Sequence, residues 1–383
     1  MDIKIDEIVK QVLSEIDAPS RPVQPKTTFV LEETPALTGR EVGKTAVLDS
    51  QEDYMIKNYV LPEVGPKEIL VCVEGCMISP SDVTEFLKER RAAGSSAQGQ
   101  EGTGIIVKVG SENLQDAKGN VLKVGDKVIA AKKAGFGGVS TYGGRKANTV
   151  APNGWFANYI VLPAGQQVYQ VNGLDLESRL LITRSISIYT EVERMSKMCK
   201  LDADKTAVVL GCGMEGLLTV AALKTLGINK IIVIDKESEK SRAMEFGAWE
   251  FIGSHGKNAG VKDKIRAAAG DMADAVFICT DSPMGRNVAR RFMKNSGSIC
   301  EMGFLCGWRR TPTARYFEDS MPAGGRFYAA RDYENCMNFL AKAAEMKLPL
   351  YKLITHRYKL EEINEAMWTV VREEGLGIAV FNR

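Results

Sequence analysis

Two patterns of hydrophobic residues divide the chain. From about residue 44 to residue 162, short apolar runs alternate with turn-forming residues, as in KTAVLD, EILVCVEG, GIIVKVG, DKVIAAK and FANYIVLP. Such runs are typical of β-strands. After about Thr183, apolar runs such as TAVVLG, KIIVID, AVFICT and GSICEMG alternate with helical stretches such as MEGLLTVAALKTLG. This order predicts an α/β fold, in which a β-rich, barrel-like domain precedes a doubly wound parallel sheet.

A third pattern lies at the N-terminus. Residues 1–16, MDIKIDEIVKQVLSEI, place apolar residues at helical spacing and charged residues on the opposite face. The proline-containing segment DAPSRPVQPKTT follows and predicts an extended tether. The arrangement resembles the encapsulation peptides that direct enzymes into bacterial microcompartments. The alternative is a helix that packs on its own chain or on a neighbouring subunit.

Composition limits the classes of function. The chain has 383 residues, enough for two domains, with 50 Lys and Arg against 48 Asp and Glu. This balance argues against a nucleic-acid partner. The absence of a long apolar run or a secretory signal predicts a cytoplasmic protein, or one in a microcompartment lumen, without a membrane partner. Eight scattered cysteines and only two histidines, His255 and His356, indicate reduced thiols and few ligands for a transition metal.

A nucleotide-binding motif lies between a predicted strand and a predicted helix. Gly211, Gly213 and Gly216 stand in G-x-G-x-x-G order. The first glycine permits a tight turn, the second lets a pyrophosphate approach the backbone, and the third lets helix and strand pack closely. Asp235 follows about twenty residues later, where a carboxylate binds the hydroxyls of an adenine ribose. We therefore predict a nicotinamide dinucleotide cofactor.

Asp235 favours NAD over NADP, because its charge would repel a 2′-phosphate. Lys236, Lys240 and Arg242 lie nearby and would soften that preference, so NADP stays open. The predicted cofactor-binding residues are Gly211, Cys212, Gly213, Met214, Glu215, Gly216, Asp235, Lys236, Lys240, Thr280 and Gly303.

Several segments together identify a family. The strand-rich half with GQEGTGIIVKVG and LKVGDKVI, the central glycine motif and the tail LITHRYKLEEINEAM resemble the medium-chain dehydrogenase/reductase superfamily, the zinc-type alcohol and polyol dehydrogenases. The resemblance covers about residues 44–383. It implies a GroES-like catalytic domain, a Rossmann domain, and a homodimer or homotetramer acting on a small-molecule substrate. The expected divisions are an N-terminal helix, a linker, the catalytic domain, the Rossmann domain and a return segment, at 1–17, 18–43, 44–184, 185–328 and 329–383.

The resemblance also implies where a catalytic zinc would bind. On this chain the family's cysteine position falls on Ser79, its histidine on Gln100, and its third ligand near Thr183. Hydroxyl and amide groups bind zinc poorly against water, so no zinc is expected. Cys76 could serve as a ligand only if its loop shifted, and a buried thiol is the alternative that we favour. The cysteines of the family's structural zinc lobe are also missing between residues 133 and 158.

Without a metal, hydrogen-bond donors must stabilise the charge that develops on the reacting oxygen. The candidate donors are Ser79, Ser81, Gln100 and Tyr189, with Ser81 at the family's relay hydroxyl. Asp82 and Glu101 are candidate acids. Their alternative roles are structural, Asp82 as a helix cap and Glu101 as a partner of Arg184.

Three function classes follow from these residues. The first is an NAD-dependent, zinc-independent oxidoreductase of a small alcohol, aldehyde, ketone or amine. The second is a zinc-free reductase of an activated C=C bond, like the quinone and enoyl reductases of the same superfamily. The third is a nucleotide-binding sensor or scaffold without catalysis. The motif order and the tail are nearer to the polyol dehydrogenases, which favours the first class.

Overall fold

The computed structural model describes most of the chain from residue 42 onwards. Its described ranges are 42–61, 63–87, 99–130, 154–163, 168–254, 260–280, 288–302 and 330–381. The predicted N-terminal helix, nearly all of the predicted linker, His255 and Gly303 lie outside these ranges, and of Ser81 only the backbone is described. In the described part, no helix has the length and apolar character needed to cross a membrane.

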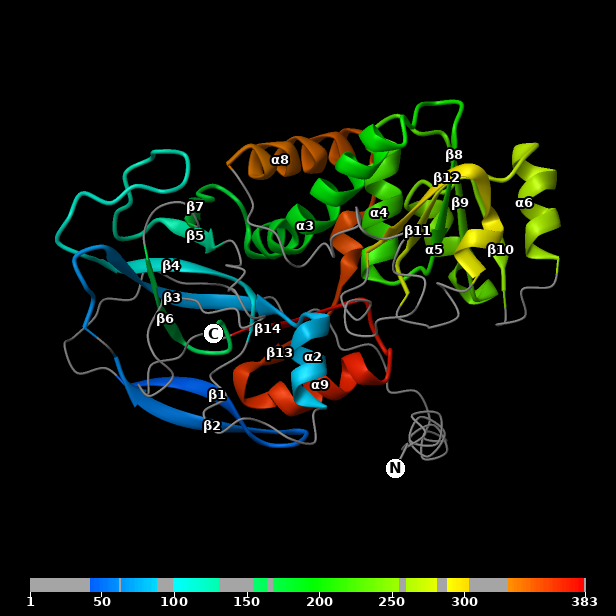
Figure 1. Ribbon diagram of the computed structural model, residues 1–383. Coiled ribbons are helices and arrows are strands. Elements are labelled where there is room, and N and C mark those ends of the chain that lie inside the picture. Colours follow the sequence, from blue (N-terminus) through cyan, green and yellow to red (C-terminus); the bar gives the residue numbers. More distant parts are fainter. Residues whose placement is uncertain are drawn as a thin grey trace. The chain divides into compact units, whose positions relative to one another are not determined.

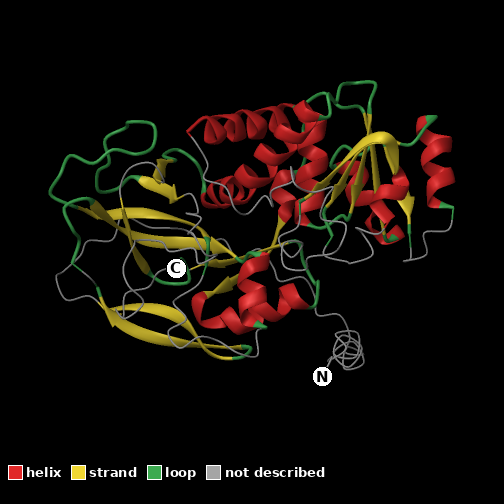
Figure 2. Cartoon of the chain, viewed as in Figure 1, coloured by secondary structure: helices red, strands yellow, loops and turns green. Residues whose placement is uncertain are grey.

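The β-rich part contains one seven-stranded sheet and one two-stranded ribbon (Figures 1 and 2). The ribbon is formed by β1 (Val42–Ser50) and β2 (Asp53–Val60). The sheet contains β3 (Glu68–Met77), β4 (Glu101–Val109), β5 (Lys127–Ala130), β6 (Tyr159–Pro163), β7 (Val168–Gln170), β13 (Ile354–Lys359) and β14 (Gly377–Phe381). Its order is β13-β14-β3-β4-β5-β7, and β6 also pairs with β3.

The central strand β3 is buried along almost its whole length. Its first half pairs with β6 and its second half with β14, so both strands share one edge of β3. Strands from the two ends of the chain therefore build one sheet over one apolar core, which includes Val71, Ile106, Trp155 and Val380. Helix α9 (Ile363–Val371) packs on this core through Ile363 and Met367.

A second sheet holds the nucleotide motif. It contains β8 (Thr206–Leu210), β9 (Lys230–Asp235), β10 (Glu250–Gly253), β11 (Ala273–Ile278) and β12 (Met293–Glu301), all parallel, in the order β10-β9-β8-β11-β12. Figure 1 shows α4 (Met214–Thr225) on one side of this sheet and α6 (Val261–Ala269) on the other. Helix α5 (Lys240–Glu245) follows β9, and short 3-10 helices lie at Glu237–Glu239, Arg290–Phe292, Leu350–Leu353 and Leu360–Glu362.

The predicted α/β architecture, a β-rich domain together with a doubly wound parallel sheet, is confirmed. The strand order reverses at β8, because the chain continues to β9 on one side and to β11 on the other. In such sheets ligands bind beyond the carboxyl ends of the strands at this reversal. The glycine motif begins directly after β8, so the topology places it where a ligand is expected.

The long helix α3 (Leu176–Met198) contacts elements of both the β-rich part and the nucleotide-motif part of the chain. It packs on β3 and β4, and it also packs on α4 and on α8 (Ala330–Glu345). The boundary that we expect between residues 184 and 185 therefore falls inside one continuous helix. Arg179 of α3 forms a fully buried ion pair with Glu74 of β3 and donates to Thr103 Oγ1 at 3.1 Å.

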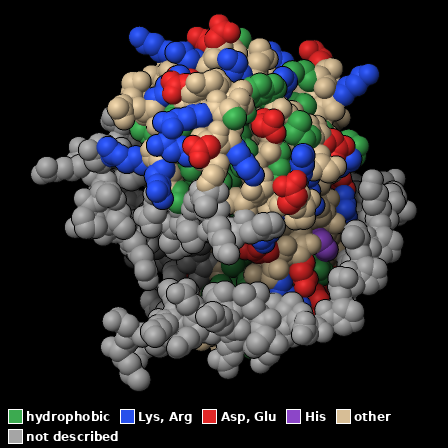
Figure 3. Space-filling view, turned by 90° about the vertical axis from the view of Figure 1, so that its right-hand side faces the viewer, with side chains coloured by type: hydrophobic (Ala, Val, Ile, Leu, Met, Phe, Trp, Pro, Cys, Tyr) green, Lys and Arg blue, Asp and Glu red, His purple; other side chains and the backbone are tan. Residues whose placement is uncertain are grey.

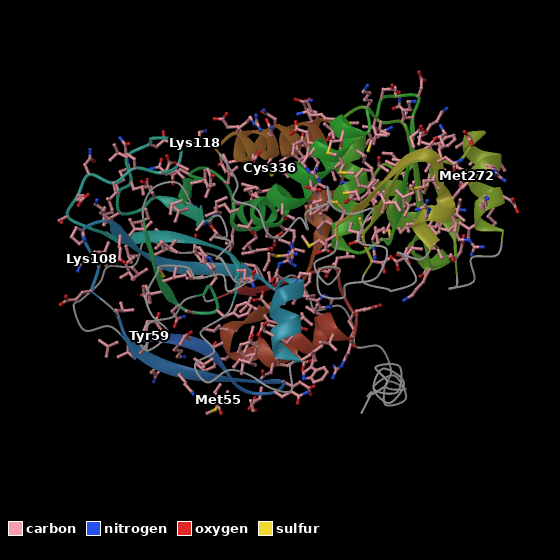
Figure 4. The ribbon with its side chains drawn as sticks, viewed as in Figure 1. Met55, Tyr59, Lys108, Lys118, Met272 and Cys336 are labelled. Carbon is pink, nitrogen blue, oxygen red and sulfur yellow. The ribbon has the colours of Figure 1, made fainter. Side chains whose placement is uncertain are left out.

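A buried carboxylate organises the loop between β4 and β5. Asp116 accepts hydrogen bonds from the backbone N–H groups of Lys118, Asn120 and Gln170 and from the Asn120 side chain, at 2.8–3.1 Å. Burial acts to raise the pKa of Asp116, but these donors outweigh it and hold that pKa below its usual value. Lys118 of this loop lies near the start of α8 (Figure 4), within 3.7 Å of Glu334 Oε1.

We expect Asp116→Asn to lower the free energy of unfolding by about 1–3 kcal/mol at pH 7, because an amide nitrogen replaces an acceptor that faces N–H donors. A carboxyl whose pKa is lower in the folded protein stabilises the fold above its unfolded pKa, and this stabilisation is lost as the pH falls through the folded pKa. The difference between wild type and Asp116→Asn should therefore shrink below about pH 4. Urea unfolding at several pH values measures it.

The exposed Asp263→Asn on α6 is the matched control and should change stability little at any pH. An Asp116→Asn protein as stable as wild type at pH 7 would contradict the role given to this carboxylate.

Candidate active site

The glycine turn after β8 is built as a nucleotide-binding turn. Gly211 has φ +101°, and a Cβ there would lie 2.7 Å from the carbonyl oxygen of Cys279. A Cβ on Gly216 would lie 2.0 Å from the carbonyl oxygen of Gly211. Both positions therefore need glycine for the fold itself. Around Gly213, by contrast, no described atom outside its own turn and helix backbone lies within 4 Å of an added Cβ, so among the described residues the backbone is open to an approaching group.

The open position coincides with the start of a helix. Gly213 is the N-cap of α4, and no side chain caps its first turn. The first N–H groups of a helix lack partners within it and favour a negative charge, so this turn fits a pyrophosphate. Thr280, which follows β11, borders the same turn, since its Cβ lies 3.2 Å from a Cβ added to Gly211. Gly303 lies outside the described residues.

Asp235 ends β9 and faces the glycine turn. Its Oδ2 accepts the backbone N–H of Cys212 at 2.6 Å, and its Oδ1 accepts the N–H of Lys236 at 2.7 Å. The carboxylate is therefore held beside the turn where an adenine ribose binds in this motif. The Cys212 thiol is buried, and this burial raises its pKa to about 12, with Asp235 and Glu239 adding to the effect. Cys212 is accordingly a protonated packing residue.

The three cations near Asp235 all have acidic partners. The pairs are Lys236 Nζ with Glu373 Oε2 at 3.7 Å, Lys240 Nζ with Glu237 Oε1 at 3.8 Å, and Arg242 Nη1 with Glu239 Oε2 at 2.5 Å. Figure 3, seen from the α6 side, shows basic and acidic side chains interspersed on this face. Because these pairs are exposed they add little stability, but they reduce the positive charge offered to a phosphate.

Ser79 and Asp82 together cap the helix α2 (Pro80–Phe86). The Ser79 hydroxyl donates to Asp82 Oδ2 at 2.6 Å and accepts the Asp82 N–H, while Asp82 accepts the N–H groups of Ser79 and Gly99. The alternative prediction of Asp82 in a helix cap is confirmed, with Ser79 as the N-cap residue. Ser79 gives its proton to Asp82, so it is a poor donor for a substrate oxygen. Ser81 lies between them in the first turn.

A buried arginine connects Glu101 to the glycine motif. Arg184 Nε lies 3.0 Å from Glu101 Oε2, which confirms the predicted pair. Its Nη1 donates to Glu215 Oε1 at 3.2 Å, and its Nη2 donates to the carbonyl oxygen of Ile78 at 2.9 Å. Burial acts to lower the pKa of Arg184, but the carboxylates of Glu101, Glu215 and Asp82 together raise it. The guanidinium is therefore charged at every working pH.

The contacts of Arg184 to Glu215 and to Ile78 were not predicted. The sequence held a signal for them, because Arg184 stands in the apolar helical run LLITRSISIY. A charged side chain on a buried helix face needs a charged partner. Glu215, a carboxylate inside the glycine motif, is the second such signal. The sequence therefore indicates that each residue needs a charged partner, but it does not indicate that Arg184 and Glu215 pair with each other.

The positions of the family's zinc ligands do not fit the metal. Ser79 is engaged with Asp82, and the Thr183 hydroxyl donates to the carbonyl oxygen of Leu180 at 2.7 Å. Gln100 offers only a neutral amide. Cys76 is 1% exposed on β3, and burial, followed by the charge of Asp82, raises the pKa of its thiol well above the usual value. The residues that the structure describes include no group of three His, Cys, Asp or Glu side chains placed to hold a metal ion.

Tyr189, predicted as a donor, lies in a different environment. Its ring stacks on Phe339 of α8, with ring centroids 4.9 Å apart. Burial, with a contribution from Glu193, raises the pKa of its hydroxyl to about 12. The structure places Tyr189 on the face of α3 that packs on α8, so we assign it a packing role. His356 is likewise structural, because it lies on β13 with Nδ1 3.0 Å from Thr355 Oγ1.

Two domain families match the chain. The alcohol dehydrogenase GroES-like domain matches residues 65–173, and the zinc-binding dehydrogenase domain matches residues 216–342. Together they cover more than half of the sequence. A sorbitol dehydrogenase of Arabidopsis thaliana is 24% identical over 85% of this chain and 92% of its own length. An L-idonate 5-dehydrogenase of Vitis vinifera is 24% identical over 91% of this chain and 97% of its own length.

Solved structures share the fold. An alcohol dehydrogenase from Thermotoga maritima superposes with a TM-score of 0.75 at 20% identity, covering 89% of this chain and 99% of its own. A 2R,3R-butanediol dehydrogenase from Bacillus subtilis gives a TM-score of 0.67 at 23% identity, covering 89% of this chain and 100% of its own. At these identities the likeness establishes the fold and leaves the chemistry to the residues of the site.

Gly211 and Gly213 should respond differently to substitution by alanine. Gly213→Ala should keep the stability of wild type, because its Cβ enters open space. It should weaken NADH binding at least about tenfold, because the methyl group occupies the place of the pyrophosphate. Gly211→Ala should instead destabilise the fold by about 1–3 kcal/mol, since it strains a left-handed backbone. Thermal unfolding and NADH fluorescence titration, measured on both variants, separate the two effects.

Gly227→Ala is the control for placing alanine at a position of positive φ that lies away from the turn. It also has a positive φ, with open space around its Cβ, and should reduce stability without affecting NADH affinity. Equal loss of NADH affinity in Gly213→Ala and Gly227→Ala would contradict the assignment of the turn.

Proposed function

Because the chain belongs to the medium-chain dehydrogenase/reductase superfamily and is one of its oxidoreductases, we propose that it uses NAD(H) and works without a catalytic zinc ion. It interconverts a small secondary alcohol or polyol with the matching carbonyl compound. The observation that carries the cofactor assignment is the open turn at Gly213 beside the held carboxylate of Asp235.

The cofactor preference rests on charge. Asp235 would lie against the ribose hydroxyls of the cofactor, where a 2′-phosphate meets a carboxylate at hydrogen-bond distance. The three nearby cations are paired with Glu373, Glu237 and Glu239, so they offset this repulsion only weakly. NAD(H) is therefore favoured over NADP(H), which is the preference that Asp235 alone predicts.

The relatives suggest the substrate class. Sorbitol, L-idonate and butanediol dehydrogenases are among the proteins that this chain resembles. Sorbitol, idonate and 2R,3R-butanediol all carry hydroxyl groups on neighbouring carbons. We therefore assign a vicinal diol, a polyol or the matching hydroxyketone as the substrate of this chain.

Zinc independence rests on the chemistry of the available donors. The hydroxyl groups of Ser79 and Thr183 are used inside the protein, and Gln100 is a neutral amide, so these positions do not form a zinc site. When bound, the nicotinamide ring supplies or accepts the hydride. The chain binds the pyrophosphate at the Gly213 turn and orients the ribose through Asp235. We assign the proton relay to Ser81, the relay hydroxyl of the family.

We expect wild-type protein to bind NADH at least about tenfold more tightly than NADPH. Asp235→Ser should narrow this ratio, because the carboxylate that repels the 2′-phosphate is gone. Lys240→Ala is the control and should leave the ratio nearly unchanged, since Lys240 is already paired with Glu237. Fluorescence titration with both cofactors measures the ratio. Tighter binding of NADPH by wild type would contradict the assignment.

We expect turnover of a vicinal diol with NAD to survive extended treatment with a chelator. Elemental analysis of the purified protein should find zinc only far below one ion per chain. Turnover is also measured on a panel of candidate substrates, which contains primary alcohols, secondary alcohols, diols, aldehydes, ketones and enones, each with NAD or NADH as required. Loss of turnover on chelation, restored by zinc, would disprove the metal-free proposal. NADH-dependent reduction of enones alone would show that the C=C reductase alternative is correct.

A further inference from the structure

Arg184 contacts three segments that are distant in sequence. It meets Glu101 at the start of β4, the carbonyl oxygen of Ile78 before α2, and Glu215 in the first turn of α4. The Arg184 side chain is only 8% exposed, so its charge acts almost entirely on these neighbours. One cation is therefore shared between the β-rich sheet and the nucleotide-binding turn.

The position of Glu215 makes this sharing important for the cofactor. Glu215 is the second residue of α4 and comes two residues after Gly213. A carboxylate at that place is close to the proposed pyrophosphate site. The negative charges of the carboxylate and of a pyrophosphate repel each other strongly where water is partly excluded. Glu215 is 24% exposed, so solvent alone screens it incompletely. The Nη1 atom of Arg184 lies 3.2 Å from its Oε1 and neutralises it.

We propose that Arg184 is a positioning residue for the cofactor: it neutralises Glu215 so that the Gly213 turn accepts a pyrophosphate, and it holds that turn to the Ile78 segment. This inference rests on the proposed nucleotide site. It adds a residue of the β-rich side to the determinants of nucleotide affinity, because Arg184 is placed by its ion pair with Glu101.

The contact with Ile78 extends the same linkage to the predicted catalytic segment. Ile78 also donates its N–H to the carbonyl oxygen of Ile378 at 3.0 Å, so the turn before Ser79 is held between Arg184 and β14. A movement of the guanidinium towards a bound phosphate would therefore change its hydrogen bond to Ile78 and, through it, the position of the start of α2. The described contacts of Arg184 are with protein groups, and the role proposed for it is therefore positioning.

The test compares four proteins by their dissociation constants for NADH. Arg184→Met should weaken NADH binding at least about tenfold, because Glu215 is left unneutralised. Adding Glu215→Gln to this variant should restore the affinity to within about threefold of wild type. Adding Glu101→Gln should not restore it, although it removes the other carboxylate that Arg184 contacts. Adenosine, measured by displacement of NADH, contains no phosphate and should bind alike to all of them.

A general structural role for Arg184 predicts a different result. In that case both second substitutions would recover NADH affinity in proportion to their recovery of thermal stability, and adenosine would be affected as much as NADH. Either result would overturn the inference. Arg266→Met, an exposed arginine on α6, is the matched control and should bind NADH as wild type does.

Glu215→Gln alone keeps the test valid if Arg184→Met does not fold, because the pair between Arg184 and Glu101 stays intact. This variant should bind NADH as tightly as wild type or a few-fold more tightly, since it removes only a negative charge. Weaker binding of NADH by Glu215→Gln would overturn the inference. Failure of wild-type protein to bind NADH at all would instead disprove the proposed function.

Discussion

The buried guanidinium of Arg184 is the interaction on which the arrangement of the site depends. Removing a charged group from water costs several kcal/mol, which only close opposite charges and good hydrogen-bond acceptors offset. Here the offset comes from two carboxylates, Glu101 at the start of β4 and Glu215 in the first turn of α4. The carbonyl oxygen of Ile78 also contributes. The two parts of the chain have separate apolar cores. Apolar packing of α3 joins these two parts, and the shared charge adds a directional contact between the first turn of α4 and the segment before α2.

The polar residues around the arginine are largely committed to one another. Ser79 and Asp82 exchange hydrogen bonds within the helix cap, and Asp82 also holds the backbone of Gly99. Gly99 immediately precedes Gln100 and Glu101, so the cap of α2 and the start of β4 are fixed together. A pre-organised polar environment of this kind acts on a reaction without rearranging during it. Ser79 and Asp82 are therefore better described as part of the frame of the site.

The sequence predicts the fold and the geometry of the glycine turn after β8, but it does not predict the partners of the polar side chains, for identifiable reasons. Strands such as β8 and β9 are local apolar runs, and the roles of Gly211 and Gly216 follow from backbone sterics that the motif itself encodes. The sequence does not reveal the partners of Tyr189 and Ser79, because the contacts of a hydroxyl-bearing side chain depend on packing. Tyr189 turns to Phe339, about 150 residues later in the chain, and Ser79 turns to Asp82. The link between Arg184 and Glu215 required the three-dimensional structure, since each residue had other plausible partners in sequence.

The proposed zinc-free mechanism and the proposed substrate class are connected by one chemical requirement. Hydride addition to a ketone places a negative charge on its oxygen, and a metal ion would stabilise that charge as a Lewis acid. Arg184 is too buried and too closely paired to take over this role. In a hydroxyketone, however, the hydroxyl on the neighbouring carbon donates a hydrogen bond to the same oxygen. A vicinal diol or polyol thus contributes part of the stabilisation itself, and the proposed relay through Ser81 has only to deliver the proton.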